Sequence, residues 1–145
     1  MRVMTLFLVV LALGVQGCAA VTSGCSDVGG FDGVSVKIPR VLDVPSGSVT
    51  FEICDAGGCA SATQRLVLGP EGPVGREVNV TFDELGRRFE PEQVTISVKL
   101  SDAKERVVAA ARRDIELSRS YPNGKPCDGD GYLGGALQMT AADRL

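Results

Sequence analysis

The sequence predicts an all-β protein, a single immunoglobulin-like antiparallel β-sandwich of seven to eight strands that follows a signal peptide. Apolar residues alternate with polar ones over several short segments, as in strands with one face in a core and the other in water. Glycine and proline separate these segments at intervals of roughly 8–14 residues, which is typical of sandwiches and small barrels. A small β-barrel is therefore the alternative architecture.

Four segments carry the clearest alternation, and we expect each to be a strand. Their ranges are 34–38, 49–53, 78–82 and 94–100. Two less regular segments are also predicted to be strands. Residues 59–68 return from the turn Asp55-Ala56-Gly57-Gly58, and residues 136–140 form the last strand. Between strands, 83–92 is expected to be a loop or a single helical turn, with Leu85 and Phe89 closing one end of the sandwich.

Residues 102–117 fit two structures. They are rich in helix formers, and Ser101 is a suitable N-cap for a helix. A strand would instead place most apolar side chains on one face, namely Val107, Ala109, Ala111, Ile115 and Leu117. We favour the strand, paired with 94–100 through a turn at 102–106, because the rest of the chain has β periodicity.

The N-terminal segment has the layout of a secretory signal. Arg2 precedes an apolar run that is too short to span a bilayer as a helix, and the small Gly17 follows. Cys18 comes directly after Gly17, and this junction resembles a bacterial lipobox, which implies cleavage before Cys18 and attachment of lipid to it. Cleavage after Ala20 is the alternative. The expected organisation is a lipoprotein signal peptide (1–17), a short tether (18–30) and the sandwich domain (31–145).

The cysteines predict two disulfide bonds. The chain has five, and four remain if Cys18 carries lipid. Secretion places these four in an oxidising compartment. Cys54 and Cys59 flank a predicted hairpin turn, where facing positions come close enough to be bridged. Cys25 and Cys127 then form the second pair. A zinc site is the competing interpretation, but the chain has no histidine and only one closely spaced cysteine pair.

Composition excludes several functions and predicts no catalytic residue, cofactor or metal. The formal net charge is -3, which gives no positive footprint for nucleic acid. Without histidine there is no Ser-His or Cys-His pair. We expect solvated loops, turns and strand faces at the remaining candidate sites for catalysis or binding. These are the acidic pairs at 83–84 and 90–92, the spacing of Ser101 and Lys104, the arginine cluster at 106–119, and the segment 128–131 with its two aspartates.

Two patches resemble small secreted lipoproteins of actinobacteria. They are Cys25-Ser26-Asp27-x-Gly29-Gly30-Phe31-x-Gly33-Val34 and Tyr121-Pro122-Asn123-Gly124-x-x-Cys127, the latter followed by Gly135-Ala136-Leu137. The hairpin Cys54-Asp55-x-Gly57-Gly58-Cys59 is in keeping with them. The resemblance implies anchoring and a sandwich fold, and no activity.

The expected function is a lipid-anchored binding or envelope-interaction module without catalytic activity, on the extracytoplasmic face of the cell membrane. Its partners would be the membrane, through the anchor, and an envelope protein or polymer, with no nucleic acid. A freely secreted protein is the alternative location. A histidine-independent envelope hydrolase and a calcium- or ligand-responsive sensor are the alternative functions, and the sequence leaves the oligomeric state open.

Overall fold

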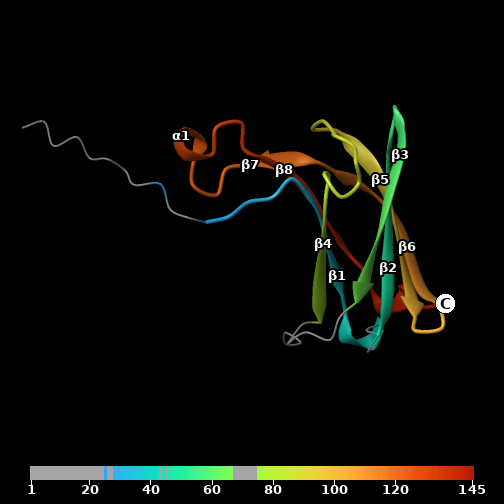
Figure 1. The fold of residues 1–145 in the computed structure, drawn as a ribbon. Helices are drawn as coiled ribbons and strands as arrows, with labels where there is room; N and C mark the ends of the chain where they lie inside the picture. The colour runs from blue at the N-terminus through green and yellow to red at the C-terminus, as the bar shows by residue number, and fades with distance from the viewer. Residues whose placement is uncertain (1–24, 26–27, 43, 45, 67–74) are drawn as a thin grey trace, which may run out of the picture.

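The protein is a sandwich of two four-stranded β-sheets, as predicted. The computed structural model describes Cys25 and the ranges 28–42, 44, 46–66 and 75–145. The predicted signal peptide, Cys18 and most of the predicted tether lie outside these residues. The two sheets are not joined into a closed barrel, so the barrel alternative is wrong. Figure 1 shows the two layers facing each other.

The first sheet is wholly antiparallel and is built from two hairpins. Its strand order is β3 (Gly58–Leu66), β2 (Gly47–Asp55), β5 (Gln93–Asp102) and β6 (Val107–Glu116). This order differs from the A-B-E-D order of immunoglobulin domains, so the likeness to them is one of architecture. The strands predicted at 49–53, 59–68 and 94–100 are all present in this sheet. Residues 67–68 of the second one lie outside the described part of the chain.

The 102–117 segment forms a strand, as favoured, and the helix alternative is wrong. Ala109, Ala111 and Leu117 face the core and are at most 5% exposed. Ile115 is half-buried, and Val107 at the strand's start is exposed. A one-residue shift in register between Leu100 and Ser101 lies next to the turn. Burial of one face against the second sheet therefore overrides the helix propensity of this segment.

The second sheet is mixed. Its order is β4 (Arg76–Thr81), β1 (Gly33–Ile38), β8 (Tyr132–Gln138) and β7 (Ser118–Ser120). β1 and β8 run parallel, which departs from the wholly antiparallel arrangement expected. This pair joins the first strand of the domain to the last. Since alternation shows only which face of a strand is buried, the direction of a neighbour was not readable from it.

Two features of the second sheet were not predicted from the alternation of apolar and polar residues. β8 begins at Tyr132, earlier than predicted, because glycines interrupt its alternation. A Cβ at Gly135 would lie 2.6 Å from Ile115 Cδ1, so glycine there allows the two layers to approach closely. The short β7 contains no apolar residue and continues from β6 after Leu117, and nothing in its sequence marked it as a strand.

The core confirms the predicted apolar faces. Ten side chains of β1, β2 and β5 are at most 2% exposed: Val34, Val36, Ile38, Val49, Phe51, Ile53, Val94, Ile96, Val98 and Leu100. Leu85 and Phe89 are also buried, and the ring centroid of Phe89 lies 4.9 Å from that of Phe82. These loop residues close one end of the sandwich, as expected.

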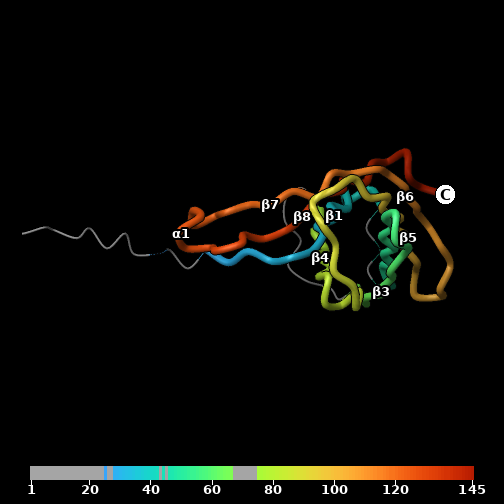
Figure 2. Tube along the Cα trace, turned by 90° about the horizontal axis from the view of Figure 1, so that it is seen from above, coloured from blue at the N-terminus to red at the C-terminus, as the bar shows by residue number. Residues whose placement is uncertain are grey.

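An arm extends from one end of the sandwich. We use this name for residues 28–32 and 118–133, which include β7 and the short helix α1 (Lys125–Asp128). Figures 1 and 2 both show α1 at the far end of the arm, with the blue segment that leads into β1 alongside. The C-terminus lies on the other side of the molecule in both views. Residues 28–30, assigned by sequence to the tether, thus lie along the arm.

Candidate functional site

The tip of the arm, at α1, is fixed to the chain around Cys25 and Val28 by a disulfide bond and by the side-chain amide of Asn123. Cys25 and Cys127 are paired as predicted, with Cα atoms 5.6 Å apart. Asn123 Nδ2 donates hydrogen bonds to the carbonyl oxygen of Val28 and to Asp128 Oδ1, each at 2.8 Å. The main-chain N–H of Asn123 donates to Asp128 Oδ2 at 2.8 Å. These contacts hold α1 against the chain that leads to the N-terminus.

The base of the arm depends on one carboxylate and one close contact. Asp32 Oδ1 accepts a hydrogen bond from the main-chain N–H of Leu133 at 2.6 Å. Gly30 lies directly under the ring of Tyr132, where any Cβ would overlap the ring. Gly30, in the first of the glycine-rich patches quoted above, therefore has a packing role, because a side chain there would fill the space of the ring.

The arm presents apolar and cationic groups to solvent. Val28 is 54% exposed and Phe31 is 39% exposed. Lys125 Nζ lies 5.3 Å from the centroid of the Tyr121 ring. Arg119 Nη1 donates to the carbonyl oxygen of Asp130 at 3.1 Å. These exposed apolar and cationic groups are distributed over the two chain segments that form the arm.

The β2–β3 hairpin carries the second cysteine pair. Cys54 and Cys59 face each other across the hairpin, with Cα atoms 4.0 Å apart, as predicted. Asp55 accepts a hydrogen bond from the Gly57 N–H at 2.7 Å and forms an ion pair with Arg87. The Arg87 guanidinium carbon lies 5.1 Å from the Phe89 ring centroid. The hairpin tip is thereby attached to the loop that closes the sandwich.

Of the acidic residues considered for catalysis, Glu84 has a structural role. Glu84 accepts hydrogen bonds from Thr81 N–H at 2.7 Å, from Thr81 Oγ1 at 2.9 Å and from Gln64 Nε2 at 3.1 Å. The Thr81 main-chain bond is the main reason why the pKa of Glu84 lies below its ordinary value of 4.5. Asp83, Glu90 and Glu92 are exposed. Glu84 closes the turn after β4.

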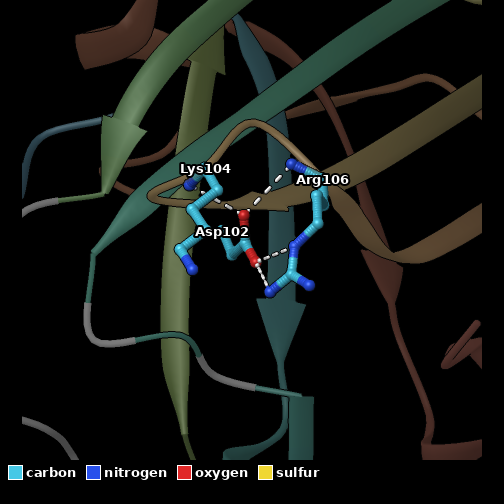
Figure 3. A network of polar contacts seen from close by, with 3 residues as sticks. All are labelled: Asp102, Lys104 and Arg106. Atoms are coloured by element: carbon cyan, nitrogen blue, oxygen red, sulfur yellow. Dashed lines mark hydrogen bonds and ion pairs between the residues drawn. The ribbon is translucent and has the colours of Figure 1, made fainter.

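Asp102 organises the β5–β6 turn (Figure 3). Its Oδ1 accepts the main-chain N–H groups of Lys104 at 2.8 Å and Arg106 at 3.1 Å. Its Oδ2 accepts Arg106 Nε at 2.9 Å and Nη2 at 2.7 Å. The bond from the Arg106 side chain is the largest cause that lowers the pKa of Asp102. The spacing of Ser101 and Lys104 therefore belongs to a turn.

The C-terminal segment is attached through charged groups to β6 and to the short 3-10 helix η1 (Arg40–Leu42). Asp143 accepts hydrogen bonds from Arg113 Nη2 and from the Thr140 N–H, each at 2.8 Å. Burial would raise the pKa of Asp143, but the Thr140 and Arg113 hydrogen bonds together lower it. Arg144 donates to the carbonyl oxygen of Val41. Three of the four arginines considered as a basic cluster thus have acceptors of their own, namely Arg106, Arg113 and Arg119.

Within the described ranges, no group of three or more His, Cys, Asp or Glu side chains is placed to hold a metal ion. Asp128, in the segment considered for calcium, has both carboxylate oxygens hydrogen-bonded by Asn123. No helix in the described part of the chain is long and apolar enough to cross a membrane.

The protein is therefore a β-sandwich domain with two disulfide-paired sets of cysteines, one at the tip of the arm and one in the β2–β3 hairpin. Comparison with known proteins finds no matching family model, no matching curated protein and no matching solved structure.

Proposed function

We propose that this protein is a lipid-anchored, non-catalytic binding or envelope-interaction module on the extracytoplasmic face of the membrane. The observation that carries the proposal is the Cys25–Cys127 pair at the tip of the arm. Cys18 precedes Cys25 by seven residues, and an extended chain of that length spans at most about 25 Å. A lipid on Cys18 would thus keep the arm tip close to the bilayer and the sandwich farther out.

The cysteine pairing supports a location outside the cytoplasm. Disulfide bonds persist in oxidising compartments and are rare in the cytosol. Both predicted pairs lie at disulfide distance, and one of them joins residues 102 positions apart in the sequence. A chain made for a reducing compartment would gain little from this arrangement.

The roles of the charged residues support binding over catalysis. The three carboxylates whose pKa is lowered are Glu84, Asp102 and Asp143, and hydrogen bonds within the described fold account for each. Lowered values favour the ionised form that accepts these bonds. Loops carried by a rigid sandwich are a common place for recognition. We therefore assign the loops and the arm to binding.

The test is the intact mass of the full-length chain expressed in a bacterial host and recovered from the membrane fraction. We expect cleavage before Cys18, the added mass of a diacylglycerol, and a gain of two hydrogens per disulfide on reduction. The variant Cys18→Ser should lose the lipid and leave the membrane fraction while keeping both disulfides.

Two outcomes would contradict the proposal. One is a cytoplasmic protein with all thiols free. The other is a product cut after Ala20 without lipid, which would identify a freely secreted protein.

A further inference from the structure

The outer edge of β3 carries main-chain groups that have no partner among the described residues. The Cα atoms of Cys54 and Cys59 are 4.0 Å apart, which is the short spacing of a facing pair that exchanges no main-chain hydrogen bonds. The polar main-chain groups of Cys59 therefore point away from β2. Because this direction alternates along a strand, the same holds for Ser61, Thr63 and Arg65.

The other sheet edges in the described part of the chain are protected. β7 has only three residues. On β4, the carbonyl oxygen of Asn79 accepts a hydrogen bond from Gln64 Nε2 at 2.9 Å. On β6, the Val108 carbonyl accepts the Leu145 N–H at 3.0 Å. Such short or covered edges prevent pairing with another chain.

Among the residues that the structure describes, β3 has none of these protections. It is nine residues long, contains no proline, and pairs with β2 in an unbroken register. Its single charged residue is Arg65, near one end. A long, regular and almost uncharged edge is a template for a further strand.

We propose that the β3 edge binds the β3 edge of a second copy of this chain, antiparallel, across a two-fold axis at Ala62. This register places Ser61 opposite Thr63 of the second copy and Cys59 opposite Arg65. Each of these facing pairs exchanges two main-chain hydrogen bonds, about eight bonds in all. In no other two-fold register do all the outward main-chain N–H and C=O groups of Cys59, Ser61, Thr63 and Arg65 find a partner. The two four-stranded sheets become one continuous sheet.

Charge and side-chain size favour a second copy over a partner of another kind. The axis at Ala62 puts the two Arg65 side chains at opposite ends of the paired segment, so no like charges meet. Ser61 and Thr63 are small, exposed polar residues that suit cross-strand pairing. An edge that is complementary to itself needs no partner of opposite charge. Figures 1 and 2 show that the arm extends away from β3.

The experiment measures the oligomeric state of the full-length chain in detergent by analytical ultracentrifugation over a range of concentrations. The informative variant is Ser61→Lys, with Ser97→Lys as its matched control. Both serines face Glu52 on β2, Ser61 from the edge strand and Ser97 from the central strand β5. The two variants therefore place the same charge in the same row of the sheet.

We expect a reversible dimer. Ser61→Lys should raise its dissociation constant at least about tenfold, because it places two lysines on diagonal positions of the paired edges. Ser97→Lys should change that constant by less than about twofold. Circular dichroism checks that both variants keep their strands.

Amide hydrogen exchange on the unsubstituted chain gives an independent result if a variant does not fold. The amides of Ser61 and Thr63 should become protected as concentration rises, whereas those of Ala60 and Ala62 are protected by β2 throughout. A monomer at every concentration would overturn the proposal, and so would a dimer that Ser61→Lys does not weaken. A monomer that captures an extended peptide of another protein would also overturn it. None of these results depends on lipid at Cys18.

Discussion

The guanidinium of Arg113 lies 2.8 Å from the carboxylate of Asp143, a contact that attaches the C-terminal segment to β6. Asp143 also accepts the N–H of Thr140 at 2.8 Å. The carboxylate is buried, with its side chain 7% exposed, and the arginine side chain is 48% exposed. The two partners should therefore contribute unequally to stability.

We expect Asp143→Ala to lower the free energy of unfolding by about 1–2 kcal/mol, because it removes a cap and the partner of Arg113 together. Arg113→Ala should cost less than about 1 kcal/mol, since water replaces most of what an exposed guanidinium loses. Urea unfolding of both variants measures the difference. A larger loss for Arg113→Ala would contradict this account of the contact.

Stability should be flat near neutral pH and should fall in acid. Glu84, Asp102 and Asp143 have folded-state pKa values below their ordinary values of 4.5, 3.8 and 3.8. A lowered folded pKa gives stability that is present above the ordinary value and is lost as pH falls through the folded value. Thermal unfolding from pH 7 downward should therefore show a decline that begins near pH 4–5.

The variant Glu84→Gln provides the control for the pH dependence. This variant should be less stable than the unsubstituted protein at pH 7. Its free energy of unfolding should also fall less on acidification, because one of the three carboxylates with a lowered pKa is gone. A decline as steep as that of the unsubstituted protein would show that Glu84 does not contribute.

The two disulfides should differ in their contribution to stability. Cys25 and Cys127 are separated by 102 residues, and Cys54 and Cys59 by 5. In the chain-entropy model, the longer loop corresponds to about 4–5 kcal/mol and the shorter to about 2 kcal/mol. Urea unfolding of the two paired Cys→Ser variants tests this order. Equal losses would mean that the arm unfolds separately from the sandwich.

The packing of Gly30 against Tyr132 gives a local test of the arm. Gly30→Ala should displace the ring and destabilise the arm by about 1–3 kcal/mol. Gly29→Ala is the matched control, because a Cβ there meets nothing within 4 Å. The chain has no tryptophan and two tyrosines, Tyr121 and Tyr132, and both lie in the arm.

Tyrosine fluorescence is consequently a probe of the arm alone. We expect its unfolding midpoint to fall for Gly30→Ala and to stay nearly unchanged for Gly29→Ala. Equal midpoints for the two variants would show that the close contact with the ring is not needed.

Sequence periodicity was a reliable guide wherever one strand face is buried. Val34, Val36 and Phe51 alternate with polar residues and lie in the core. The prediction that Leu85 and Phe89 close one end of the sandwich rests instead on their spacing of four residues in the loop, and both are buried. Periodicity identified the 102–117 strand less directly, from the β pattern around it.

Pairing of the cysteines was also predicted, although for different reasons in the two cases. Cys54 and Cys59 flank a short turn, so local geometry brings them together. Cys25 and Cys127 were paired because no other cysteines remained, and only the arm explains how they meet. The arm itself was not predicted, since β7 and α1 have neither alternation nor a helical apolar stripe.

By itself, the sequence determined the class of fold, the buried face of most strands and the cysteine pairs, because each of these follows from local periodicity or from counting. The tertiary structure alone decided which strands are neighbours, that β1 and β8 run parallel, that α1 meets the segment around Cys25 and Val28, and that the outward main-chain groups of β3 have no partner among the described residues. Those features arise from contacts between residues far apart in the chain, and a local pattern of polar and apolar side chains does not specify its distant partner.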